Sequence, residues 1–247
     1  MEVLFFSLLP AIIYSFIVYL STPYRAVVFS TGLSYCSAGF ISIVLVAITH
    51  TIFPFVTQQH LTPPVGLFLF AFLQVALVEE MSKWASFRLL NTVRKVPDPP
   101  VAVLFYSMMT SAGFAVFENY QYASHYGKDI IFYRTFSSVI VHMACGIIMG
   151  YLIARGQMNT NLRYKSVFEI FLKKNWKWRR SIYTVLGILA ASAAHGIFDY
   201  VLMADRRNAD YKVLVMVFAA LWLSFHLGRR LSYEHIVVEE NSEDANV

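Results

Sequence analysis

Apolar residues occur along this chain in blocks of about 20, the length that a helix needs to cross the ~30 Å hydrocarbon core of a bilayer. Short polar segments separate the blocks, so each block predicts one transmembrane helix. The seven blocks are 3–20, 26–49, 64–90, 101–123, 133–154, 181–204 and 212–230. The pattern therefore predicts an all-α, polytopic membrane bundle with about seven transmembrane helices.

Composition supports a single membrane domain. The chain is 57% hydrophobic and 14% charged, whereas soluble domains are about 45–50% apolar. We expect one seven-span domain over 1–232 and an acidic, disordered cytoplasmic tail over 233–247. The first block has no basic segment before it and no small-residue cleavage site after it, so we expect it to be retained as a span.

Two segments between spans carry distinctive residues. Segment 91–100 contains three prolines, which lack a backbone donor and disfavour helix before them, so it is expected to be a turn. Segment 155–180 mixes tryptophan with lysine and arginine, which is typical of a helix on anionic lipid head groups. Because this segment adjoins a span, we interpret it as lipid-binding and expect no nucleic-acid partner.

Basic residues predict the orientation of the bundle. If the spans alternate in direction, 15 of the 20 Lys and Arg residues fall on one side of the membrane. The side with more basic residues is usually cytoplasmic. We therefore expect a multi-pass protein with its N-terminus outside and its C-terminus in the cytoplasm.

Ionisable residues inside the spans are the candidates for function, because such a residue at the centre of a lipid-exposed helix costs about 2.5–3.5 kcal/mol. They lie on four successive spans: Glu79, Glu80 and Lys83; Glu118, beside Asn119; His142; and His195 with Asp199. Residues four apart share a helix face, so the last two side chains point the same way. Small residues surround them and would allow close helix packing.

Depth along the helices tests whether these side chains can meet. At 1.5 Å per residue, Glu118, His142, His195 and Asp199 lie about 8–14 Å from the outer ends of their spans, and Glu79 lies at about 22 Å. A later start of the third span, or helix tilt of about 20°, would reduce the difference. We therefore expect one cluster just outside the membrane midplane.

Such a cluster can activate water in two ways, and both stay open at this point. His142 and His195, with Glu118 or Asp199, are residue types that bind zinc with one position left for water. Without a metal, a buried glutamate can accept a proton from water that a histidine orients. Either route leads to attack on an amide carbonyl.

The order of the motifs adds a resemblance. EExxK stands at 79–83, GFAxxEN at 113–119, a histidine followed by glycines at 142–150, and HxxxD at 195–199. This order resembles the PrsW family of intramembrane proteases, relatives of the CAAX prenyl protease superfamily, over spans three to six, within 64–204. The resemblance implies cleavage of a single-span membrane substrate in a bacterial cytoplasmic membrane.

These observations together assign roles to the motif residues. Glu79 is expected to be the general base and Glu80 its partner, and either Glu80 or Lys83 would tune the pKa of Glu79. His142 and His195 would orient water or ligate a metal, with zinc as the candidate ion. Glu118 and Asp199 would be ligands or orienting groups, and Asn119 would donate to the developing oxyanion.

Other classes of protein make different predictions. The sequence contains no HExxH and no GxSxG motif, which disfavours a zincin-like protease and a serine hydrolase. A non-catalytic seven-span scaffold, like the anterior-pharynx-defective subunit of gamma-secretase, is the first alternative, although a scaffold does not need paired glutamates. A proton-coupled transporter is the second, but no inverted repeat supports it.

Overall fold

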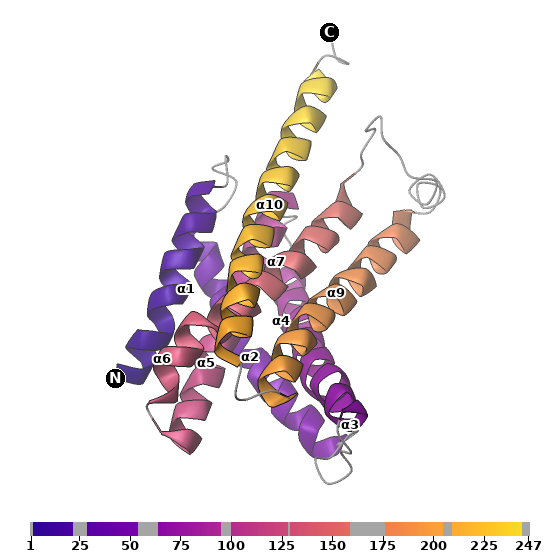
Figure 1. The fold of residues 1–247 in the computed structure, drawn as a ribbon. Coiled ribbons are helices and arrows are strands. Elements are labelled where there is room, and N and C mark those ends of the chain that lie inside the picture. The colour runs from indigo at the N-terminus through magenta and orange to yellow at the C-terminus, as the bar shows by residue number, and fades with distance from the viewer. Residues whose placement is uncertain are drawn as a thin grey trace.

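The computed structural model describes residues 2–21, 29–53, 64–94, 100–127, 129–158, 176–204 and 209–243. These residues are almost entirely helical and contain no strand. Their elements, in order, are α1 (Glu2–Ser21), α2 (Phe29–Ile52), α3 (Val65–Leu69), η2 (Phe70–Leu77), α4 (Val78–Arg94), α5 (Pro100–Tyr126), α6 (Ile130–Phe136), α7 (Ser138–Gln157), α9 (Trp176–Ala204) and α10 (Ala209–Glu243). Figure 1 shows a bundle whose successive long helices run in opposite directions. The predicted all-α fold is confirmed.

Six helices of the described residues are long and apolar enough to cross a membrane. They are Phe29–Ile52, Val65–Arg94, Pro100–Tyr126, Ile130–Gln157, Trp178–Ala204 and Asp210–Leu231. The first predicted span contributes a shorter apolar stretch, Leu8–Leu20. Long apolar helices can satisfy their backbone hydrogen bonds within lipid, so the chain is a multi-pass membrane protein.

The centre of the bundle is α5, which packs against α2 on one side and α7 on the other. In the most apolar stretch of α5, 89% of the residues are buried, whereas in that of α10 only 17% are buried. Glycines permit the close approach: a Cβ atom at Gly113 would lie 1.9 Å from the Cys36 carbonyl oxygen, and one at Gly146 would lie 2.6 Å from the Ser111 hydroxyl. The backbones of α2, α5 and α7 therefore meet nearly without intervening side chains.

An eight-residue π-helix, η2, leads directly into α4. A π-helix bonds each N–H to the carbonyl five residues back and is rare, and such segments are frequently found at functional sites. The His50 ring nitrogen Nε2 lies 2.9 Å from the Gln74 carbonyl oxygen in this segment. On the other side, Phe72 packs where a Cβ at Gly196 would otherwise lie. Both neighbours, α2 and α9, thus support the irregular turn.

Two predictions about segments outside the spans need correction. Helix α4 continues to Arg94, so the first part of the expected 91–100 turn is helical; 95–99 lie outside the described residues. Helix α10 continues to Glu243, so most of the tail predicted to be disordered from 233 is helical. The acidic residues are compatible with a helix that extends beyond the apolar stretch. Of 155–180, the part 159–175 lies outside the described residues.

Candidate active site

The ionisable residues of the four motif-bearing spans meet inside the bundle. Helices α4, α5, α7 and α9 each contribute at least one of them. Glu80, Lys83, His142 and His195 are all at most 3% exposed. Four separate sequence segments therefore converge on one buried polar cluster, as the depth argument expected.

Lys83 lies at the middle of this cluster. Its ammonium nitrogen Nζ is 2.7 Å from Glu80 Oε1 and 2.9 Å from His142 Nδ1. It is also 3.6 Å from Glu79 Oε2 and 4.1 Å from the centre of the Phe114 ring. One buried cation thus contacts both glutamates of α4, a histidine of α7 and an aromatic face of α5.

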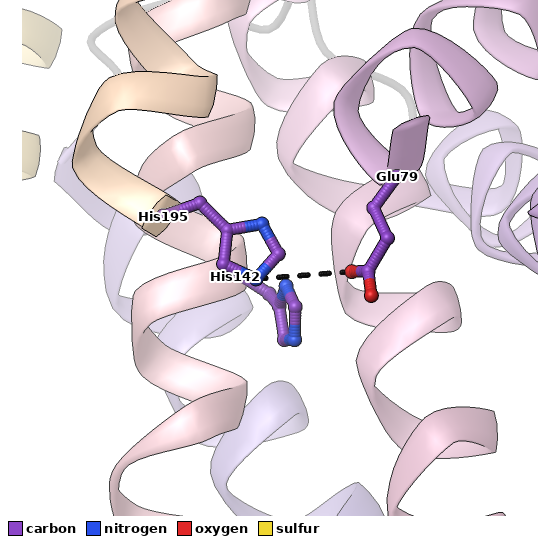
Figure 2. Close-up of side chains that lie close together, drawn as sticks. All are labelled: Glu79, His142 and His195. Carbon is purple, nitrogen blue, oxygen red and sulfur yellow. Dashed lines mark ion pairs between the residues drawn. The ribbon is translucent and has the colours of Figure 1, made fainter. Parts of the chain in front are cut away.

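His195 faces carboxylates at both ring nitrogens. Nδ1 is 3.0 Å from Glu80 Oε1, and Nε2 is 3.3 Å from Asp199 Oδ2. Nε2 also lies 3.8 Å from Glu79 Oε2, an ion pair that Figure 2 marks. Carboxylate oxygens only accept hydrogen bonds, so an imidazolium that donates from Nδ1 to Glu80 and from Nε2 to Asp199 satisfies both contacts.

The three residues drawn in Figure 2 have the donor set of a metal site. One ligand atom each from Glu79, His142 and His195 lies within 4.8 Å of the others. Glu79 Oε2 is buried and has no hydrogen-bond partner among the described residues. Two imidazoles and a carboxylate whose Oε2 is left unpaired fit a zinc-type ion, which binds nitrogen and oxygen ligands of this kind.

The outer part of the cluster is organised by Arg134, at the end of α6. Its Nη2 donates to Glu118 Oε2 at 2.6 Å, and its Nε donates to Asn119 Oδ1 at 2.9 Å. Glu118 Oε2 is also 2.9 Å from His142 Nε2. Sequence reasoning grouped Glu118 with the histidines as a ligand; the structure places it between an arginine and a histidine. Asn119 keeps a buried Nδ2 that has no partner among the described residues.

Sequence reasoning did not assign Arg134 to the site. It was counted only as one of the basic residues outside the membrane. A usable signal existed, because Arg134, Ser138 and His142 follow one another at four-residue steps and so share a face. The structure joins them: Arg134 Nη2 donates to the Ser138 hydroxyl at 3.1 Å.

Comparison with known proteins places this cluster in a family. The profile of the family described as PrsW family intramembrane metalloprotease matches residues 22–224. Proteins named Protease PrsW are similar to the chain: one from Oceanobacillus iheyensis is 34% identical over 107 residues, and one from Bacillus subtilis is 27% identical over 157 residues.

These relatives are matched only in part. The similarity covers 43% of the chain and 50% of the Oceanobacillus protein, and 64% of both the chain and the Bacillus protein. No solved structure matches the chain significantly. The family profile nevertheless spans most of the chain and every residue of the buried cluster. The chain belongs to the PrsW family.

Proposed function

We propose that this chain is an intramembrane endopeptidase that cleaves a membrane-anchored protein with water activated at Glu79. The proposal rests on the burial and the contacts of the Glu79 carboxylate. It is buried beside His195, yet it forms no hydrogen bond among the described residues. Glu79 and Glu80 are the two candidate bases, and each has a buried Oε2 without a hydrogen-bond partner among the described residues. Glu80 Oε1 is already engaged by Lys83 at 2.7 Å and by His195 at 3.0 Å, whereas Glu79 makes only longer contacts, of 3.6 and 3.8 Å, with the same two residues. Glu79 is thus the better acceptor for a proton from water.

The remaining residues of the cluster would hold the reacting groups in position. Glu80 and Lys83 hold His195 and His142 in fixed orientations through contacts of 2.7–3.0 Å. Held in this way, the imidazoles can direct a water molecule toward Glu79. Arranging the reacting groups before the reaction removes much of the entropic barrier.

Asn119 is suited to stabilise the negative charge that develops on the carbonyl oxygen. Its Oδ1 is held by Arg134, which leaves Nδ2 as a buried donor with no partner among the described residues. A fixed amide donor of this kind acts most strongly where water is excluded. The proposed oxyanion donor and the proposed base come from neighbouring helices, α5 and α4.

The same residues could hold a metal. Glu79, His142 and His195 would be its ligands, with Asp199 close to His195. A bound zinc ion would supply Lewis-acid activation of water or of the carbonyl. Glu79 takes part in both the metal-dependent and the metal-free chemistry, so its replacement is expected to stop either.

The proposal includes the setting of the reaction. The relatives are bacterial, and we place the chain in the bacterial cytoplasmic membrane with its C-terminus inside. The partner would be a membrane protein with a single span. Its cleavage site would lie near the outer side, where Arg134 ends the cluster.

The test is cleavage of single-span test substrates by the purified full chain reconstituted in vesicles. Glu79→Gln keeps the shape of the side chain and removes the proton-accepting charge, so activity should fall by at least about 10²–10⁴-fold. Asp129→Asn is the matched control, because it changes an exposed acid outside the cluster in the same way. It should retain full activity.

A chelator arm separates the two chemistries. Loss of activity with a chelator, restored by added zinc, supports the metal-dependent route; unchanged activity supports the metal-free route. Full cleavage by Glu79→Gln would reject the assigned base. No cleavage of any substrate by the wild-type chain, with stable co-purification of another membrane protease, would favour the scaffold alternative.

A further inference from the structure

A polar cavity lies away from the proposed active site, between α4, α7 and α9. Its volume is about 460 Å³. The residues that line it come from the C-terminal ends of α4 and α7 and from the N-terminal part of α9. Arg88 on α4 is nine residues from Glu79, about 13 Å along a helix. The cavity is therefore a separate feature, at the end of the bundle that the basic residues mark as cytoplasmic.

The polar groups that line the cavity are suited to an anion. Arg88 and Arg180 enter from different helices, and both are exposed. Neither guanidinium group has an acidic partner among the described residues, and no Asp or Glu lines the cavity. Two positive charges that face a shared space repel each other unless an anion lies between them.

A neutral hydrogen-bond donor also lines the cavity. Asn91 lines the same cavity, and its Oδ1 accepts a hydrogen bond from the Tyr35 hydroxyl. Arg94 donates to that hydroxyl at 3.0 Å. With Oδ1 directed at the tyrosine, Nδ2 is the end of the Asn91 amide that can donate to a ligand. The cavity thus combines two cations with an oriented amide donor, and guanidinium groups bind phosphate oxygens well.

The surroundings of the cavity suggest the source of the phosphate. Trp84 and Phe87 form part of the cavity wall. Tryptophan is enriched at the level of lipid head groups. Along α9, from Arg180 toward the middle of the bundle, Val185 and Leu189 are 54% and 51% exposed. A phospholipid could place its phosphate between the arginines and its acyl chains along these side chains.

We propose that this cavity binds the phosphate of an anionic phospholipid from the cytoplasmic leaflet. The binding is independent of proteolysis, because none of the proposed catalytic residues lines the cavity. A free phosphate ion would satisfy the same polar groups but would gain nothing from the exposed aliphatic side chains. The two sources can therefore be separated by comparing ligands with and without acyl chains.

The test is a titration of the purified full chain in detergent with short-chain phosphatidylglycerol, short-chain phosphatidylcholine and inorganic phosphate, followed by native mass spectrometry. We expect saturable binding of phosphatidylglycerol that is at least tenfold tighter than binding of the other two. The double variant Arg88→Gln, Arg180→Gln should weaken it by roughly tenfold or more, because two charge-assisted contacts are lost. Arg230→Gln, at the same end but outside the cavity, should leave it unchanged.

Two outcomes would overturn the proposal. Equal binding of the anionic and the zwitterionic lipid, unaffected by the double variant, would show that the arginines recognise no phosphate. Inorganic phosphate that binds as tightly as phosphatidylglycerol, and is lost in the double variant, would assign the cavity to a soluble phosphate group. Circular dichroism of the double variant, with helix content equal to that of wild type, excludes misfolding as the cause of a loss.

Discussion

Lys83 connects the two histidines of the cluster, although they lie on different helices. It contacts His142 directly and reaches His195 through Glu80. The two imidazole rings are themselves 4.6 Å apart, edge to face. Removing one partner from a buried charged group leaves the other uncompensated, which costs about 3–5 kcal/mol for an ion pair. We therefore expect these residues to act as one unit.

Replacing the histidines tests this coupling. His142→Ala and His195→Ala should each abolish cleavage, and the double variant should be hardly worse than either single one, because members of one catalytic unit fail together. His125→Ala is the control, since His125 is exposed and lies outside the cluster. The measurement is kcat/KM for one test substrate. Additive losses would indicate that the two histidines act independently.

Asn119 can be tested through the split between kcat and KM. Asn119→Ala removes the proposed oxyanion donor, so kcat should fall by about 10²–10³-fold while KM changes little. A donor that acts only in the transition state has this signature. A rise in KM with unchanged kcat would instead assign Asn119 to substrate binding.

Helix periodicity explains why several contacts could be predicted. His195 and Asp199, and Glu79 and Lys83, stand four residues apart, and the structure brings both pairs within 3.6 Å. The contacts of Arg134 with Glu118 and Asn119 span 15–16 residues, across the turn between α5 and α6. The four-residue step to Ser138 indicates which face Arg134 shares, but no local period predicts these two longer contacts.

At the level of helices, the glycines of α7 that follow His142 allow this helix to pack closely against α5. A Cβ at Gly146 or Gly150 would lie 2.6–2.8 Å from atoms of α5. The π-helix was not predicted, because its apolar residues do not differ in type from those of an ordinary helix. The depth estimate allowed a later start of the third span to bring Glu79 closer to the other residues. The third span begins at Val65, so a later start does not explain how Glu79 reaches His195.

The α2–α5 crossing gives a stability prediction. At Gly113 a methyl group would overlap the backbone of α2, where the nearest atom is 1.9 Å away, whereas at Gly228 it would meet nothing within 4 Å. Gly113→Ala should therefore lower the free energy of unfolding by about 1–3 kcal/mol or more. Gly228→Ala should leave it nearly unchanged. The midpoint of thermal unfolding in detergent is measured for both variants. Equal midpoints would contradict the close α2–α5 crossing at Gly113.

For the whole molecule, composition and block length were sufficient to predict the class of fold. Apolar blocks predict spans because lipid requires internally bonded helices. They do not predict which helix is central. The most apolar stretches of α5 and α10 have the same mean hydropathy of 1.6, yet 89% and 17% of their residues are buried. That difference depends on glycines and on polar side chains that meet only in three dimensions.

The orientation of the molecule is a separate prediction. Because 15 of 20 basic residues fall on one side, a reporter that is active only in the cytoplasm should be active when fused after Val247. The same reporter fused after Gly127, in the turn after α5, should be inactive. The reverse pattern would place the basic cavity and its proposed lipid in the opposite leaflet.

The π-helix has a consequence for insertions. Each residue added in α-helical geometry turns the chain by about 100°, so inserting one residue into Phe70–Leu77 would change the angular phase of everything that follows. Phe72 is held against Gly196, so the start of the segment cannot rotate to compensate. Glu79 and Glu80 would then point away from the histidines with every motif residue still present. The length of this segment is thus as much a determinant of the site as the identity of its residues.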